Sequence, residues 1–135
     1  MSKILGIDYG AKRIGVAMSD ENGKIAFPFL ILPNDKDSMS LLGDLCGKEK
    51  IERIVMGESL DERENENEIM PEARLFVEAL SGKTGLPVSF EKEFMTSVEA
   101  HRSAFKEQGK IGRQEVDASA AALILQRYLD KINSK

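Results

Sequence analysis

The sequence predicts an α/β fold built on a mixed five-stranded sheet, with antiparallel strands first, parallel strands later and helices on both faces. Three strand-like runs lie close together near the N-terminus, and their short separations suit hairpins. Two further strand-like runs each follow a helical segment, which is typical of parallel crossover units. The predicted order is therefore three strands, then helix, strand, helix, strand and two final helices.

The first three predicted strands cover about residues 3–9, 13–19 and 25–32, which are rich in β-branched and aromatic side chains. The segment "YGAK" separates the first two strands. The segment "ENGK" precedes the third, and its Asn-Gly pair accepts the positive φ angles of a tight hairpin. These features predict an antiparallel meander, whose first strand becomes central when the later parallel strands are added.

The remaining elements follow from turn and cap residues. Pro33 to Asp35 ends the third strand, and Ser38 is a candidate N-cap for the next helix. Pro71 suits the first turn of the second helix. The predicted elements after the meander are a helix to about 49, a strand at 51–57, an acidic loop at 58–72, a helix from Pro71 to Gly82, a strand at 87–94 and helices at 98–108 and 115–131.

Length and composition favour one globular domain spanning residues 1–135. The chain is 41% hydrophobic, which suffices for a single core. No apolar run has the length of a membrane span, and the N-terminus lacks the pattern of a secretory signal. We therefore expect a soluble, cytoplasmic protein with no membrane partner. The single cysteine, Cys46, lies among leucines, which predicts a buried side chain rather than a reactive thiol.

The charge is distributed unevenly along the chain. A net charge of -4 argues against an indiscriminate nucleic-acid binder, which usually carries a basic surplus. Acidic residues dominate the segment 58–72, in which Glu58, Asp61 and Glu62 are expected to be solvated or, alternatively, one of them to assist metal binding. The segment 101–113 instead carries four basic residues against Glu107 alone, and such a local basic edge is compatible with phosphate binding. These basic residues are Arg102, Lys106, Lys110 and Arg113.

Asp8 is an unusual residue for its position. It follows the apolar run Ile4 to Ile7 and is followed at once by a segment of glycines and basic residues. A carboxylate there is costly to bury unless its charge is compensated. Because ligands gather at the strand ends of such sheets, we expect Asp8 to converge with Glu93 at the end of the last strand and Asp117 in the first turn of the last helix. Alternatively, Asp117 only complements the helix dipole and Glu93 is an exposed strand-end charge.

Three converging carboxylates would repel one another unless they held cations. Hard oxygen ligands suit Mg²⁺ or Mn²⁺, and a two-metal site can activate water and stabilise the leaving oxygen of a phosphodiester. Beside Asp8, Gly10 would let the backbone approach a phosphate that Lys12 or Arg13 neutralises. The alternative is an ordinary turn with solvated basic side chains.

Three segments resemble one known family. "GIDYGAKRIGVAMSD" (6–20) is similar to the N-terminal motif of the YqgF family, also called RuvX. "TSVEAHR" (96–102) is similar to the segment after that family's catalytic glutamate, and "VDASAAALILQRYLD" (116–130) to its C-terminal motif. These segments lie at the start and in the final third of the chain. Together with the order of elements that connects them, they extend the resemblance over nearly the whole chain. The resemblance implies a ribonuclease H-like fold and hydrolysis of phosphodiester bonds with divalent metal ions.

The resemblance also implies residue roles and a process. It assigns catalysis and metal binding to Asp8, Glu93 and Asp117, and places Lys12 and Arg13 near the scissile phosphate. The implied process is trimming of the 5′ end of precursor 16S rRNA in the bacterial cytoplasm, by a monomer or a homodimer. The chain departs from the family at two sites. Lys92, Glu93 and Phe94 replace Asp-Glu-Arg, and Gly57 to Ser59 replaces Gly-Leu-Pro.

Three other functions stay open at this point. The same chemistry acting on four-way DNA junctions would favour a two-fold dimer that cuts paired strands. A catalytically altered module that binds RNA or the ribosome is compatible with the changed residues around Glu93. An actin-like ATPase is disfavoured, because that architecture closes two lobes around a nucleotide and 135 residues supply one.

Overall fold

A computed structural model describes residues 3–60, 68–94 and 113–134 of the chain, without the side chains of residues 60, 93, 94 and 113–118. Eight elements occur in these ranges. The strands are β1 (Lys3–Tyr9), β2 (Arg13–Ser19), β3 (Ala26–Pro33), β4 (Ile51–Leu60) and β5 (Val88–Phe94), and the helices are α1 (Ser38–Lys48), α2 (Met70–Thr84) and α4 (Arg113–Asn133).

The five strands form one mixed sheet in the order β3-β2-β1-β4-β5. The pairs β1–β2 and β2–β3 are antiparallel, whereas β1–β4 and β4–β5 are parallel. This arrangement confirms the predicted meander and the two crossover units. It also confirms that β1 is the central strand, so Asp8 lies in the middle of the sheet.

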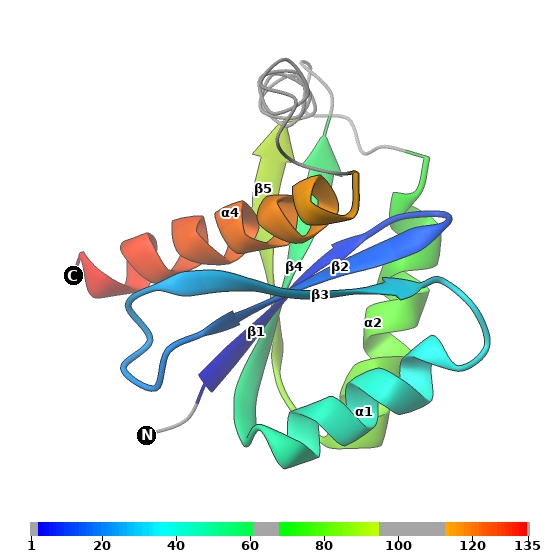
Figure 1. Ribbon diagram of the computed structural model, residues 1–135, viewed down its shortest axis with the longest axis horizontal. Helices are drawn as coiled ribbons and strands as arrows, with labels where there is room; N and C mark the ends of the chain where they lie inside the picture. Colours follow the sequence, from blue (N-terminus) through cyan, green and yellow to red (C-terminus); the bar gives the residue numbers. More distant parts are fainter. Residues whose placement is uncertain (1–2, 61–67, 95–112, 135) are drawn as a thin grey trace.

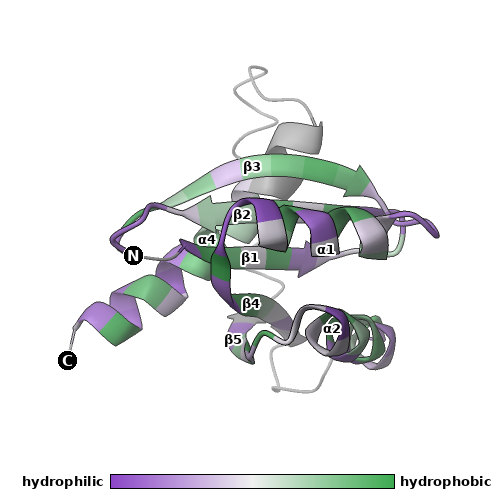
Figure 2. Ribbon diagram, turned by 90° about the horizontal axis from the view of Figure 1, so that it is seen from below, coloured by the Kyte–Doolittle hydropathy of each residue, from purple (hydrophilic) through white to green (hydrophobic). Residues whose placement is uncertain are grey.

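Helices cover both faces of the sheet, as predicted (Figure 1). Helices α1 and α2 lie on one face and α4 crosses the other. Each face has its own hydrophobic core because side chains alternate along the strands. Figure 2 shows that the strands are mainly hydrophobic, whereas the hairpin turns are hydrophilic. The α1–α2 side buries Leu5, Ile7, Ile14, Val16, Leu42, Ile54, Met56, Val77 and Leu80, and the α4 side buries Ile4, Ala17, Val55, Ala121, Ile124, Leu125 and Leu129.

Local chemistry explains where several elements begin and end. Gly23 adopts φ 68° in the β2–β3 hairpin, which confirms the predicted turn, and Gly85 adopts φ 74° after α2. Pro71 lies in the first turn of α2 as predicted. The prediction that Ser38 is an N-cap was wrong. Ser38 is already helical, and its hydroxyl donates to the carbonyl of Asp35 at 2.8 Å, so it stabilises the preceding turn instead.

Several element boundaries differ from the predictions, and helix α2 ends at Thr84, two residues beyond the predicted Gly82. Strand β4 continues to Leu60, so Gly57 to Ser59 pair with β5 rather than opening a loop. Helix α4 begins at Arg113 and ends at Asn133, two residues beyond the prediction at each end. The predicted helix at 98–108 and most of the acidic loop lie outside the described residues. Cys46 is buried, as expected. In the ranges that the structure covers, no helix is both long and apolar enough to cross a membrane.

Candidate active site at the carboxyl end of the central strand

Asp8 lies near the carboxyl end of β1, and its side chain is half-buried. Alternation along β1 places it on the same face as Gly6, which packs against Leu125 of α4. Its partner in β2 is Gly15. On the other side, the register pairs Ile7 with Met56, so Gly57 is the next residue of β4. Glycines therefore flank Asp8 in both neighbouring strands, and neither contributes a side chain beside its carboxylate.

The positions of Gly15 and Gly57 beside Asp8 were not predicted from the sequence. Each residue looked like part of a turn or a strand end, and only the strand register shows that they flank Asp8. The sequence did contain a signal for Gly15, which lies seven residues after Asp8. Because a short hairpin pairs residues on either side of its turn, this spacing places Gly15 opposite Asp8. That signal could have been found for Gly15 but not for Gly57, whose position depends on the parallel register of a distant strand.

The turn between β1 and β2 carries the candidate phosphate-binding residues. A Cβ on Gly10 would lie 2.6 Å from the carbonyl oxygen of Arg13, so the turn requires glycine there. Lys12 is exposed at the tip of the turn, and the half-buried Arg13 begins β2. The β1–β2 turn therefore carries Gly10, Lys12 and Arg13 close to Asp8 in the fold, and their role in binding phosphate stays a prediction.

Helix α4 brings the backbone of Asp117 toward the same end of the sheet. A Cβ on Gly6 would lie 3.2 Å from the carbonyl oxygen of Ala121, which shows how closely α4 approaches β1. At the other end of α4, Asn133 donates to the carbonyl of Gly23 in the β2–β3 hairpin at 2.9 Å. Helix α4 therefore runs opposite to β1. Asp117 lies one turn before Ala121, and Asp8 lies two residues beyond Gly6.

Strand β5 places Glu93 near the same end. Gly57 pairs with Glu91 and Ser59 with Glu93, so Glu93 lies two strands away from Asp8 and two residues further along. Strand spacings of about 4.8 Å and rises of about 3.3 Å put the two backbone positions about 12 Å apart. The side chains of Glu93 and Asp117 lie outside the description, so the expected three-carboxylate cluster stays a prediction.

Glu91 is a carboxylate that the sequence did not single out. It is buried on β5, and its Oε2 lies 2.8 Å from Nζ of Lys131 on α4. The neighbouring carbonyl of Lys92 accepts a hydrogen bond from Arg127 at 3.3 Å. Helix α4 thus supplies two cations to β5, a contact between segments about forty residues apart that no local pattern indicates.

Metal binding finds partial support in the described residues. Asp8 offers carboxylate oxygens, which are the donor type that Mg²⁺ and Mn²⁺ prefer. Within the described ranges, no group of three or more histidine, cysteine, aspartate or glutamate side chains is close enough to hold an ion.

Arg113 is the first residue of α4, with its side chain outside the description, and the basic residues at 102, 106 and 110 also lie outside it.

Glu58 is not a solvated charge, which the sequence had suggested for the acidic run. Its carboxylate accepts from Arg74 of α2 at 2.9 Å, and its side chain is 20% exposed. The same guanidinium lies 5.0 Å from the ring centroid of Phe90. These contacts join α2 to β4 and β5 beside the candidate site. Asp61 and Glu62 lie outside the described residues.

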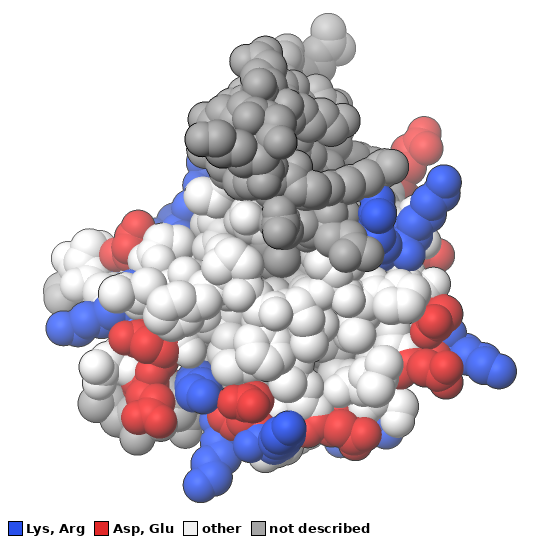
Figure 3. All heavy atoms as spheres, in the orientation of Figure 1, with Lys and Arg blue, Asp and Glu red and all other residues white. Residues whose placement is uncertain are grey.

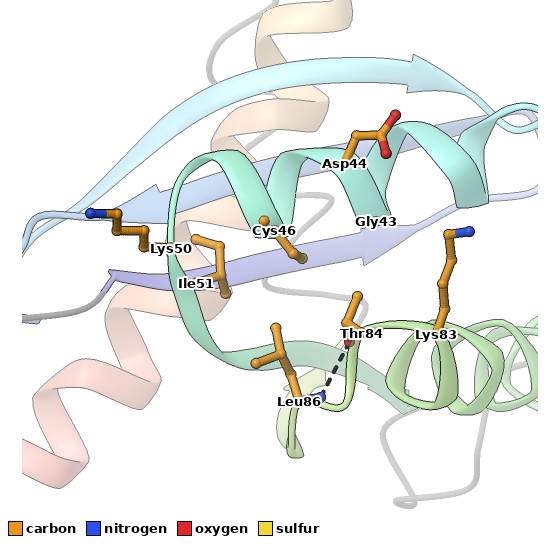
Figure 4. Close-up of a pocket in the computed structure, with 9 residues that line it drawn as sticks. Gly43, Asp44, Cys46, Lys50, Ile51, Lys83, Thr84 and Leu86 are labelled. Carbon is orange, nitrogen blue, oxygen red and sulfur yellow. Dashed lines mark hydrogen bonds between the residues drawn. The ribbon is translucent and has the colours of Figure 1, made fainter.

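A cavity of about 510 Å³ lies between the C-terminal ends of α1 and α2 (Figure 4). Its lining includes Ile51 at the start of β4 and Leu86 before β5. Because β1 and β4 are parallel, this cavity lies at the opposite end of the sheet from Asp8. Its acidic lining residue, Asp44, points away from the cavity in Figure 4. The cavity is therefore separate from the candidate active site.

Figure 3 shows the side of the molecule along β3. An uncharged band crosses the middle of this side, and lysine, arginine, aspartate and glutamate side chains surround it. Exposed apolar residues Ile25, Phe27 and Phe29 belong to this strand or its approach. No continuous basic surface is visible there among the atoms shown in colour or white.

Solved structures with a similar fold identify the architecture. The RuvC protein of T. thermophilus in complex with a Holliday junction substrate has a TM-score of 0.62 and 15% identity, with 100% of this chain and 98% of that chain covered. The fowlpox virus resolvase in complex with Holliday junction DNA has a TM-score of 0.58 and 10% identity, with 96% and 98% covered. The fold is therefore that of the ribonuclease H-like resolvases.

Sequence comparison defines the family within this class. The model of the family described as "RuvX: Holliday junction resolvase" matches residues 2–131, and the chain belongs to this family. A "Putative pre-16S rRNA nuclease" of Sulfurihydrogenibium is 36% identical over 135 residues, covering 98% of this chain and 93% of the relative. A protein of the same name from Nitratidesulfovibrio vulgaris is 37% identical over 139 residues, covering 98% and 96%. The family that the three motifs indicated is confirmed.

Proposed function

We propose that this protein is a divalent-metal-dependent nuclease that processes the 5′ end of precursor 16S rRNA. The observation that carries this proposal is Asp8, placed at the carboxyl end of the central strand between Gly15 and Gly57. The relatives named as pre-16S rRNA nucleases match nearly the full length of the chain, which supports the substrate class.

The proposed active site consists of Asp8, Glu93 and Asp117. Asp8 lies on the central strand β1, Glu93 on the edge strand β5 and Asp117 on α4, which crosses one face of the sheet. These carboxylates would hold Mg²⁺ or Mn²⁺, which when bound polarises the phosphodiester and lowers the pKa of an attacking water. The protein's own contribution is to fix three acids around an open space, so that the phosphate is oriented for in-line attack.

The substrate side of the site is the β1–β2 turn. Lys12 and Arg13 would neutralise phosphate charge, and Gly10 permits the close turn that carries them. We also assign Arg113 to substrate binding, because it begins α4 at the same end of the molecule as Asp117. Recognition of structured RNA would then depend largely on the shape and phosphates of its backbone.

A cleavage assay tests this proposal. Purified wild-type protein and the Asp8→Asn variant are incubated with a labelled 16S precursor 5′ end, with and without Mg²⁺ or Mn²⁺. We expect metal-dependent cutting by the wild type and at least a hundredfold slower cutting by Asp8→Asn. Asp44→Asn is the matched control, because this exposed acid lies at the opposite end of the sheet, and it should cut like the wild type. Equal cutting by Asp8→Asn and the wild type would refute the assigned site.

A second candidate substrate is a four-way DNA junction, which the description of the matching family names. The same assay includes this junction as a parallel substrate. Cutting of the junction alone would replace the rRNA assignment with junction resolution. RNA binding by both proteins without cutting by either would identify a non-catalytic RNA-binding module.

A further inference from the structure

Asn34 lies against the turn that connects β1 and β2. Its side-chain Nδ2 donates to the carbonyl oxygen of Gly10 at 2.7 Å, and its backbone N–H donates to the carbonyl oxygen of Lys12 at 2.9 Å. Both ends of the turn are thus bonded to one residue that follows β3. Hydrogen bonds at these distances restrict the turn, since each carbonyl has a fixed donor.

A second contact ties the same turn to α2. The hydroxyl of Tyr9, one residue before Gly10, lies close enough to the Asn34 side chain and to the carboxylate of Glu72 in the first turn of α2 for both to influence its pKa. The Tyr9 ring also packs on Phe76, with 5.0 Å between ring centroids. Partial burial raises the pKa of the Tyr9 hydroxyl, so it stays a hydrogen-bond donor at neutral pH.

The Tyr9 ring packs against the hydrophobic core, whereas the two Asn34 bonds are made to the turn beyond it. The turn protrudes from the end of the sheet, Lys12 at its tip is exposed, and the strands β1 and β2 are already paired along their length. A turn of this kind tolerates motion in many proteins. Here two elements that follow it in the chain, the end of β3 and the start of α2, restrain it from both sides.

We infer that Asn34 is a positioning residue that holds the Gly10 to Lys12 turn in the conformation that presents Lys12 and Arg13 to a substrate phosphate beside Asp8. Tyr9 supports Asn34 through its hydroxyl. This inference rests on the proposed function, because it concerns the phosphate side of the same site. The substrate class is nucleic acid, and Asn34 acts through the turn rather than by touching the substrate.

The test compares Asn34→Leu with Asn133→Leu. Asn133 makes the same contact, an asparagine Nδ2 donating to a glycine carbonyl in a hairpin, but at Gly23 at the opposite end of the sheet. The probe is the labelled 16S precursor 5′ end. For Asn34→Leu we expect kcat/KM for cutting to fall by about tenfold. In EDTA, the slope of log affinity against log salt should become shallower by about one, which corresponds to one lost phosphate contact. Asn133→Leu should change neither value.

Two further measurements separate the possible failures. Hydrogen exchange follows the Asn34 backbone amide, and Asn34→Ala, which keeps that amide but loses the side chain, should exchange there about tenfold faster than the wild type. Thermal melts confirm that the variants are folded. Folded Asn34 variants with wild-type exchange, salt slope and kcat/KM would overturn the positioning role. A wild type that neither binds nor cuts the RNA would overturn the proposed function, and the exchange data would still decide whether Asn34 restrains the turn.

Discussion

Replacing Gly6 with alanine tests whether the close approach of α4 to β1 serves both the fold and the site. Gly6 lies in the buried part of β1, two residues before Asp8. An added Cβ would lie 2.8 Å from Cβ of Leu125 and 3.2 Å from the carbonyl oxygen of Ala121. Neither atom can rotate away, because one is fixed to the α4 backbone and the other belongs to it.

The size of the effect follows from these distances. Carbon atoms in contact prefer separations of about 3.5–4.0 Å, so α4 must move by about 1 Å to accept the methyl group. Overpacking of this kind costs about 1–3 kcal/mol of unfolding free energy. The same shift moves the start of α4, which carries Asp117, relative to Asp8. A misplacement of about 1 Å in a catalytic group can cost about a hundredfold in rate.

Urea denaturation and the RNA-cutting assay measure the two effects separately. We expect Gly6→Ala to lose about 2 kcal/mol of unfolding free energy and ten- to a hundredfold in kcat, at temperatures where it is fully folded. Gly82→Ala is the control, because Gly82 lies in α2 and an added Cβ there would meet nothing within 4 Å. This variant should gain up to about 1 kcal/mol from helix propensity and keep its activity.

Two results would contradict the reasoning about Gly6. If Gly6→Ala were as stable as the wild type, α4 would not be packed against β1 as closely as the structure shows. If Gly6→Ala lost stability but kept its kcat, the position of α4 would not matter for catalysis. The second result would weaken the assignment of Asp117 while leaving the fold intact.

Two other predictions concern charge. Backbone N–H groups of the β2–β3 hairpin donate to Asp20 and lower its pKa. The ionised Asp20 therefore stabilises the fold above the unfolded pKa of about 3.9, and this stabilisation is lost as the pH falls through the lower pKa of the folded state. In urea titrations, Asp20→Ala should flatten the dependence of unfolding free energy on pH below about 4. Lys131→Ala should cost about 1–2 kcal/mol, because the Glu91 side chain is 5% exposed and loses its partner. Lys3→Ala leaves the carboxylate of Glu49 without its partner, but that side chain is 23% exposed, so this variant should cost less than about 1 kcal/mol in the same assay.

The local parts of the fold were predictable because their causes are local. The strands and hairpins of the meander depend on alternating side chains and on the Asn22-Gly23 pair, and β1, β2 and the start of α2 were correctly placed. Asp8 stood out because a carboxylate that follows an apolar run is costly to bury unless its charge is compensated. These features can be read from neighbours in the chain without knowing what packs against them.

The parts that could not be predicted depend on contacts between distant segments. Strand β4 was expected to end at Gly57, but pairing with β5 carries it on to Leu60. Glu58 looked like part of a solvated acidic run until Arg74 was found beside it. Asn34 looked like a strand breaker, and only the structure shows that it bonds to Gly10. Each of these residues has an ordinary local role, so no sequence pattern identifies its contact with a distant segment of the chain.

The ion pair between Glu91 and Lys131 helps to decide which acid of β5 belongs to the site. Glu91 is level with Asp8 across the sheet, with Gly57 between them, so two carboxylates would face each other about 10 Å apart on the α4 side. At an effective dielectric constant of about 20, their repulsion is about 2 kcal/mol. Lys131, at 2.8 Å, neutralises Glu91 and removes most of that repulsion. A carboxylate occupied by a lysine is a poor metal ligand, so the next acid along β5, Glu93, is the better candidate to share an ion with Asp8.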